Sequence, residues 1–332
     1  MHNNIFRSTL WYNLIGDQKV KNVVCIGGGT GQSALLRGLK QINNIKLSTV
    51  VAVADDGGST GRLRNDLNIP AMGDVRSVMV ALADSEDLMT KIMNYRFDKS
   101  AGDLAGHNLG NIIISALTVD SNDFYKSIVS LCRILKVKGK VYPSTTENII
   151  LKAYMSDGTI VEGESEIRES DKEIASVFYD QNVHTYKQVL QAINKADYII
   201  VGIGSLFTSI LPNLIIDDIK KALMSCQGKV IYYCNSMTEK GETSDYTVED
   251  HIQAIERHIG KKVIDAVVIS NDSIPQNILQ NYYLEGAKEV VLSQTKHDYK
   301  VFSHSLLTFE KGLVRHDPDK VKESFMEVMR EL

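Results

Sequence analysis

Acidic and basic residues lie together on one glycine-rich turn of the sequence, AVADDGGSTGRLR, residues 52–64. Carboxylates such as Asp55 and Asp56 could hold sugar hydroxyls or a divalent metal, and an arginine such as Arg62 could bind phosphate oxygens through bidentate hydrogen bonds. Because neighbouring side chains on an extended strand point to opposite faces, one of the two carboxylates is expected to reach a ligand. The alternative is a solvated turn whose charges pair with each other. The candidate ligand residues here are Asp55, Asp56, Ser59, Thr60 and Arg62.

A second glycine-rich loop, IGGGTGQSA, lies between a predicted strand and a predicted helix. Gly29, Gly31 and Ala34 match the pattern G-x-G-x-x-A, in which glycines let the backbone approach a phosphate at a helix N-terminus. The loop is not a P-loop, because no lysine follows the glycines at the required spacing. Asp55 follows Gly31 by 24 residues (55 − 31), close to where a Rossmann acidic residue binds a ribose hydroxyl. The alternative is a tight turn without a ligand. The candidate phosphate-binding residues are Gly27, Gly28, Gly29, Thr30 and Gly31.

Two further polar segments, MGDVRSVMVAL and AGHNLGN, each begin a predicted helix. Arg76 in a first helical turn is electrostatically unfavourable unless an anion, or Asp74, lies beside it. His107 could serve as a general acid or base, and the amides of Asn108 and Asn111 could bind a base edge, a sugar or a phosphate. The alternatives are a simple surface helix start and asparagine caps.

The segments VGIGSLFTSIL and YYCNSM also place polar residues directly after predicted strands. Gly204 and Ser205 form a second candidate phosphate turn, and Asn235 is a further candidate ligand residue. Serine catalysis is not expected, because Leu206 and Phe207 follow Ser205 and the nucleophile-elbow pattern G-x-S-x-G fails. No catalytic residue is therefore assigned.

The elements that must position these residues alternate between strands and helices. KNVVCI, QSALLRGLKQI and LSTVVAVADD form a β-α-β unit, which is typical of a parallel sheet. Three more core strands follow in the second half. We predict a Rossmann-like, doubly wound α/β fold with a mainly parallel sheet, in which ligands bind at the carboxyl ends of the strands. Residues 1–20 form an N-terminal extension, and residues 21–332 form one domain with a small β-rich insertion at about 133–170.

Composition limits the classes of partner. The 332 residues carry a net charge of −4, which argues against a general nucleic-acid or membrane binder. No apolar run is long enough for a membrane span or a signal peptide, so we expect a cytoplasmic protein without membrane insertion. The four cysteines are far apart and lack the spacing of a zinc site or a disulfide framework, so free thiols are expected.

Taken together, the motifs resemble those of a known family. IGGGTGQSALLRGLK, VAVADDGGSTGRLR, MGDVRSVMVAL, GHNLGN, DGTIVEGES, ADYIIVGIGSLFTSILPNLI, YYCNSMTEKGET and RHDPDKV are similar to segments of the gluconeogenesis factor family, the YvcK-like proteins. That family shares a superfamily with the CofD-type 2-phospho-L-lactate transferases. The likeness runs from about residue 20 to the end of the chain, and the combination is more specific than any single motif.

The resemblance implies a cytoplasmic regulatory protein that binds a UDP-sugar such as UDP-N-acetylglucosamine and acts in carbon-source adaptation and cell shape. It also implies that Arg315 contributes to the nucleotide-sugar site. Regulatory protein partners and a homo-oligomer are expected. The transferase branch implies instead the transfer of a phospholactyl-type group from a nucleoside diphosphate-activated donor to a deazaflavin, with Mg²⁺ held by Asp55 or Asp56. No cofactor is required under the first hypothesis, and the sequence leaves catalysis open.

Overall fold

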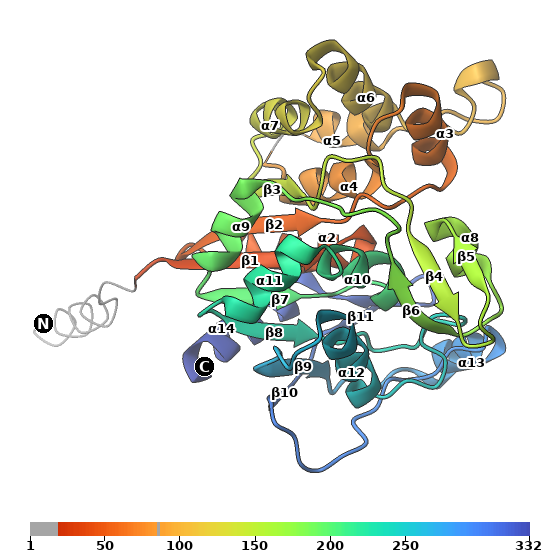
Figure 1. Ribbon diagram of the computed structural model, residues 1–332. Coiled ribbons are helices and arrows are strands. Elements are labelled where there is room, and N and C mark those ends of the chain that lie inside the picture. Colours follow the sequence, from red (N-terminus) through yellow and green to blue (C-terminus); the bar gives the residue numbers. More distant parts are fainter. Residues whose placement is uncertain (1–18, 85–86) are drawn as a thin grey trace, which may run out of the picture.

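The computed structural model describes residues 19–84 and 87–332, and a seven-stranded sheet forms the centre of this part (Figure 1). Its strands are β1 (Lys21–Gly27), β2 (Ile45–Val51), β3 (Lys140–Pro143), β7 (Tyr198–Val201), β8 (Lys229–Tyr233), β9 (Ala266–Ser270) and β10 (Lys300–His304). They lie in the order β10-β9-β8-β7-β1-β2-β3, and all neighbours are parallel. The direction of strand addition reverses between β1 and β7, which makes this pair the switch point of a doubly wound sheet. The predicted Rossmann-like fold is confirmed.

Helices cover both faces of the sheet, which explains why its strands are continuous apolar runs. On one face α2 packs against α4 and α14, and on the other α11 packs against α9 and α10. Residues 1–18 of the predicted N-terminal extension lie outside the described residues. The helices are α2 (Gly29–Leu39), α3 (Gly58–Leu67), α4 (Gly73–Leu82), α5 (Asp87–Asn94), α6 (Leu109–Ser121), α7 (Phe124–Ile134), α8 (Glu164–Glu169), α9 (Lys187–Asn194), α10 (Leu211–Leu214), α11 (Asp217–Ser225), α12 (Val248–Ile259), α13 (Gln276–Leu284) and α14 (Pro318–Glu331), with a 3-10 turn η1 (Gly102–Leu104) and a π-helix η2 (Leu206–Ile210).

A small antiparallel sheet in the order β5-β4-β6 lies to one side of the central sheet (Figure 1). It comprises β4 (Lys152–Met155), β5 (Ile160–Glu162) and β6 (Ile174–Phe178). The predicted hairpin at Asp157-Gly158 joins β4 to β5, and Gly158 has the left-handed φ of +85° that such a turn favours. The predicted insertion, 133–170, overlaps this sheet but also includes β3, which pairs with β2. Helix α8 follows β5 directly.

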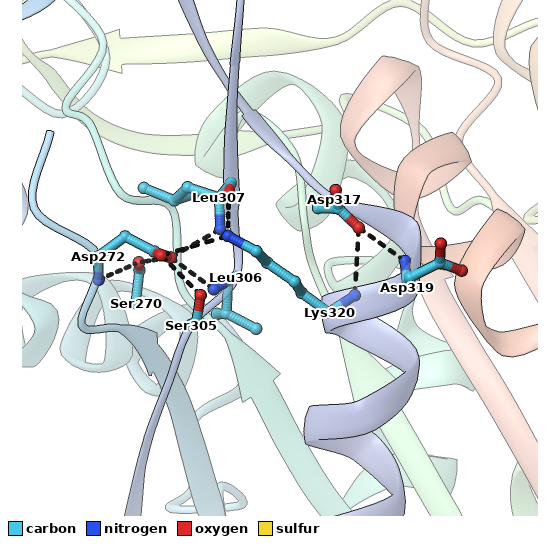
Figure 2. A network of polar contacts seen from close by, with 8 residues as sticks. All are labelled: Ser270, Asp272, Ser305, Leu306, Leu307, Asp317, Asp319 and Lys320. Atoms are coloured by element: carbon cyan, nitrogen blue, oxygen red, sulfur yellow. Dashed lines mark hydrogen bonds and ion pairs between the residues drawn. The ribbon is translucent and has the colours of Figure 1, made fainter. Parts of the chain in front are cut away.

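The C-terminal segment adds a hairpin of β11 (Leu307–Glu310) and β12 (Leu313–His316), which leads into α14. Figure 2 shows the polar network that attaches this segment to the end of β9. The Asp272 carboxylate accepts hydrogen bonds from the backbone N–H groups of Leu306 and Leu307, at 2.6 and 2.7 Å, and from the Ser305 hydroxyl at 2.6 Å. Lys320 Nζ lies 3.4 Å from the same carboxylate. The hairpin is therefore fixed beside the carboxyl ends of the central strands.

The cysteine side chains form no disulfide in the described part of the chain. The four cysteines are free, and burial raises the pKa of the Cys234 thiol to about 12, so that the thiol stays protonated at neutral pH. Within residues 19–84 and 87–332, no helix combines the length and the apolar character that a membrane span needs.

Candidate functional site

A cavity of about 530 Å³ opens at the switch point, beside the carboxyl ends of β1, β7 and β8. Its walls come from segments far apart in the sequence: the glycine loop after β1, the turn after β7, helix α8 and the C-terminal hairpin. The predicted residues that line it are Gly28, Gly29, Thr30, Gly31, Asp55, Asp74, Gly204, Ser205, Asn235 and Arg315. The structure thus brings together residues from six of the predicted segments.

The glycine loop forms the start of α2 at the cavity, where the Gly29 N–H donates a hydrogen bond to the Asp74 carboxylate. Gly28 is the N-cap residue, and neither a side-chain cap nor an acidic residue occupies the first turn. Unpaired N–H groups and the helix dipole make such an end a site for an anion. A Cβ atom on Gly31 would lie 2.7 Å from the carbonyl oxygen of Ile203, so this position requires glycine. The two strand-end loops are in direct contact there.

Asp55 and Asp56 face different ways, as expected for neighbours on an extended segment. Asp55 lines the cavity, and one of its carboxylate oxygens accepts a hydrogen bond of 3.0 Å from the Gly57 N–H. Asp56 turns away and accepts hydrogen bonds from the first N–H groups of α8, those of Glu164 at 3.0 Å and Ser165 at 2.9 Å. Asp55 therefore lines the cavity, whereas Asp56 holds the start of α8.

Asp74 lies at the start of α4 and against the glycine loop. A Cβ atom on Gly28 would lie 2.5 Å from its carboxylate. Burial, and then the charge of Asp55, raise the pKa of Asp74 to about 7, although a hydrogen bond from the Gly29 N–H acts in the opposite direction. Asp74 is therefore partly protonated at neutral pH, which reduces its repulsion of an anion bound at α2.

The second glycine turn, Gly204-Ser205, has most of its donors occupied. The Ser205 hydroxyl donates to Glu239 at 2.6 Å, and Glu242 accepts hydrogen bonds from the Phe207 N–H at 3.1 Å and the Thr208 hydroxyl at 2.7 Å. Burial, and then the charge of Glu239, raise the pKa of Glu242 to about 8. A phosphate is therefore expected at the α2 end of the cavity rather than at this turn.

Replacing Glu242 with glutamine is expected to reduce the pH dependence of stability. The folded protein keeps a proton on Glu242 up to about pH 8, whereas the unfolded chain loses it near pH 4. The stabilisation from this proton is therefore fully present at low pH and is lost as the pH rises through about 8. Between about pH 6 and pH 8, the free energy of unfolding of the wild-type protein is expected to fall by about 2 kcal/mol more than that of Glu242→Gln.

Urea unfolding at both pH values measures this difference. Glu285→Gln is the matched control, because Glu285 is exposed. Its stability should follow that of the wild-type protein. Equal pH dependence in Glu242→Gln and in the wild-type protein would contradict the assignment of a buried proton to Glu242.

Several predicted ligand residues do not line the cavity and instead form a polar cluster between α3 and α6. The Ser59 hydroxyl accepts the Asn108 N–H at 3.0 Å and lies 3.2 Å from His107 Nδ1. The Asn111 amide donates to the Thr60 hydroxyl at 3.3 Å. These contacts join the segments GGST and GHNLGN to each other. The residues outside the cavity wall are Gly27, Asp56, Ser59, Thr60, Arg62, Arg76, His107, Asn108 and Asn111.

The two arginines of this region also have internal partners. Arg76 donates to the side chain of Asn111 at 3.0 Å, and Arg62 donates to the carbonyl oxygen of Ala105 at 2.7 Å. Asn108 caps α6 by accepting the Asn111 N–H at 3.0 Å. In this structure the cluster joins helices α3, α4 and α6 beside the cavity.

The cavity wall also contains one cation that the resemblance implied, Arg315, and several residues that no motif singled out. Arg168 and Arg315 are the cations of the cavity wall, and Arg168 pairs with Glu164 at 3.4 Å. Arg315, on β12, is exposed and has no hydrogen-bond acceptor in the described part of the chain. Burial lowers the pKa of His316 to about 4, so its imidazole is neutral at physiological pH. Additional lining residues include Glu164, Arg168, Ser209, Glu239, Tyr282 and His316.

The donor set for a metal ion is small. Within the described residues, no group of three or more His, Cys, Asp or Glu side chains is placed to hold a metal ion. Both carboxylate oxygens of Asp56 accept backbone N–H groups. Asp55 is thus the member of the pair that could contribute to an Mg²⁺ site in the cavity.

The fold and the cavity together define a Rossmann-like α/β protein with a cavity at the switch point of its parallel sheet. Comparison with known proteins agrees. Residues 23–307 match the family described as 2-phospho-L-lactate transferase CofD. A crystal structure of a Bacillus halodurans protein superimposes with a TM-score of 0.89 at 40% sequence identity, covering 93% of this chain and 100% of that one.

Curated relatives give a narrower group. The chain is 39% identical over 318 residues to the gluconeogenesis factor of Bacillus subtilis (strain 168), covering 95% of this chain and 99% of that protein. It is 41% identical over 315 residues to the gluconeogenesis factor of Halalkalibacterium halodurans, covering 93% and 97%. The chain belongs to the gluconeogenesis factor family, within the CofD family.

Proposed function

We propose that this protein binds a nucleotide sugar, UDP-N-acetylglucosamine or a close relative, and acts as a cytoplasmic regulatory protein in carbon-source adaptation and cell shape. The occupied state would be recognised by protein partners, and the protein would act as a homo-oligomer. The observation that carries the proposal is the cavity at the switch point, which combines the N-terminus of α2 and two arginines with several carboxylates and the Asn235 amide. Such a site suits a ligand that has both phosphates and hydroxyls.

The arrangement of charge supports an ordered mode of binding. The diphosphate would lie at the start of α2, where glycines allow close approach and the helix dipole favours negative charge. Arg315 would add hydrogen bonds to phosphate oxygens. The Asp55 carboxylate would accept hydrogen bonds from ligand hydroxyls or amides, and Asn235 would contact the ligand beside Gly204, to which its side-chain amide is hydrogen-bonded. A volume of about 530 Å³ is within the range of small-molecule sites.

The second candidate function is a CofD-type transferase, which the description of the matching family favours. Asp55 would then help to hold Mg²⁺, which would neutralise charge on the transferring phosphoryl group. The protein's own groups would bind and orient the donor at α2.

Titration calorimetry with UDP-N-acetylglucosamine, with and without Mg²⁺, tests both functions when the ligand is afterwards analysed by mass spectrometry. A regulatory binding protein is expected to bind the ligand measurably and to leave it intact after long incubation. Product that forms only with Mg²⁺ would instead support the transferase. An absence of binding by any nucleotide or nucleotide sugar would contradict both.

A further inference from the structure

We propose that Glu164 forms the subsite that recognises the sugar part of the ligand by accepting a hydrogen bond from its hydroxyl or amide, and that Asp56 is the positioning residue of this subsite. The proposal rests on the proposed function and adds a residue that determines its specificity. It also gives a role to the segment DGTIVEGES, which contains Glu164 and otherwise contributes no ligand residue.

The first observation is an unused acceptor in the cavity wall. Glu164 lines the cavity, yet the residue is only 7% exposed. Its Oε1 lies 3.4 Å from a guanidinium nitrogen of Arg168, whereas its Oε2 is buried without a hydrogen-bond partner in the described chain. Buried polar atoms in folded proteins are nearly always hydrogen-bonded, because an unpaired one costs free energy. A donor on the ligand would satisfy this atom.

The charges around Glu164 favour a neutral donor over a phosphate as that ligand group. Burial raises the pKa of Glu164 to about 7, Arg168 acts in the opposite direction, and the carboxylates of Asp55, Asp74 and Asp56 raise it further. Three of these acids, Asp55, Asp74 and Glu164, line the same cavity. Such a wall repels anions and accepts hydrogen bonds from neutral donors. A neutral, polyhydroxylated group therefore suits Glu164 better than a phosphate does.

The second observation is how Glu164 is held in place. Helix α8 has only six residues, and its N-cap residue, Gly163, has no side chain to cap it. Asp56 supplies the cap from a distant part of the chain by accepting the N–H groups of Glu164 and Ser165. A Cβ atom on Gly163 would lie 2.6 Å from the Asp56 carboxylate, so the contact is close. The position of α8 relative to the central sheet thus depends on the residue next to Asp55.

The affinities of UDP-N-acetylglucosamine and UDP, measured by calorimetry, test the role of Glu164. In Glu164→Gln, the affinity for UDP-N-acetylglucosamine is expected to fall about tenfold, because one accepted hydrogen bond to the buried oxygen is lost. The affinity for UDP, which lacks the sugar, should stay within about twofold. Glu166→Gln changes an exposed glutamate of the same helix, and both affinities should be retained.

Asp56→Asn tests the positioning role, because it removes one of the two acceptors that hold α8. The ratio of the affinity for UDP-N-acetylglucosamine to the affinity for UDP is expected to fall, as in Glu164→Gln. A general structural defect would instead lower both affinities together. Glu164→Asp keeps the charge but shortens the side chain, and it should also lower this ratio. It is the control for an effect that comes only from the glutamine amide in Glu164→Gln.

The outcomes separate this proposal from the proposed function. Wild-type protein that binds neither UDP-N-acetylglucosamine nor UDP would overturn the proposed function itself. Wild-type protein that binds both, with a ratio unchanged in Glu164→Gln and Glu164→Asp, would leave the function standing and overturn the role of Glu164. An equal loss for both ligands in the Glu164 variants would also overturn it.

Discussion

Gly31→Ala is expected to abolish measurable nucleotide-sugar binding and to destabilise the protein. The added methyl group would lie 2.7 Å from the carbonyl oxygen of Ile203, 2.8 Å from its carbonyl carbon and 3.0 Å from the Gly204 nitrogen. These are backbone atoms at the switch point, so no side-chain rotation relieves the contact. Forcing an extra methyl group into a packed region costs about 1–3 kcal/mol. The α2 end of the cavity would also move away from the phosphate.

Gly27→Ala is the matched control in the same loop. A Cβ atom at that position would meet its nearest neighbour, the Gln32 side chain, at 3.5 Å, which is an ordinary contact. Urea unfolding and calorimetry on both variants provide the comparison. Retained binding in Gly31→Ala, or an equal loss in both variants, would show that the contact between the two loops does not shape the site.

Arg315→Ala is expected to weaken nucleotide-sugar binding without changing the stability of the protein. Arg315 lines the cavity, is exposed, and has no acceptor in the described chain, so a ligand phosphate is its natural partner. Losing a hydrogen bond to a charged group costs about 1.5–3 kcal/mol, which is roughly a 10- to 150-fold loss of affinity. Calorimetry measures the affinity, and thermal unfolding should give the same midpoint as the wild-type protein.

Arg62→Ala is the control that distinguishes the two arginines. The Arg62 guanidinium donates to the carbonyl oxygen of Ala105 and does not line the cavity. The affinity of this variant is therefore expected to be unchanged. If Arg62→Ala weakened binding and Arg315→Ala did not, the proposed position of the phosphates would be wrong.

The central sheet could be predicted from the sequence because its strands are apolar runs that helices bury on both faces. β1 and β7 show this clearly. β10, β11 and β12 were not predicted, because they are short and carry polar or exposed residues, as in the burial pattern of Lys300–His304. Their pairing depends on long-range contacts such as those of Asp272, which leave no local pattern in the sequence.

Part of the candidate site could also be predicted, because some of its residues form local sequence patterns. Glycines that follow a strand and begin a helix indicate an anion site by local chemistry, and Gly28 and Gly31 do line the cavity. The segment GHNLGN contains equally polar residues, but the structure places Asn108 and Asn111 in an internal cluster. Residue type alone does not separate these cases, because a polar side chain can be satisfied by a ligand or by another part of the protein.

The residues that join the cavity from elsewhere could not be found locally. Arg168 and Glu164 come from a six-residue helix whose position depends on Asp56, over 100 residues earlier in the chain. Tyr282 comes from α13, and its hydroxyl accepts the Val314 N–H at 3.0 Å. Each of these placements follows from tertiary packing, which a single sequence does not reveal.

The attachment of the C-terminal hairpin has a consequence for synthesis of the protein. The glycine loop at Gly28 leaves the ribosome early, whereas the opposite wall, with Arg315, is among the last segments to be translated. Until Asp272 has bound the backbone at Leu306 and Leu307 and paired with Lys320, the cavity lacks that wall. A chain that ends before α14 lacks this wall and also the helix whose Val321, Phe325 and Val328 are buried in the core against α2, so the last segment to be translated completes the cavity and the core together.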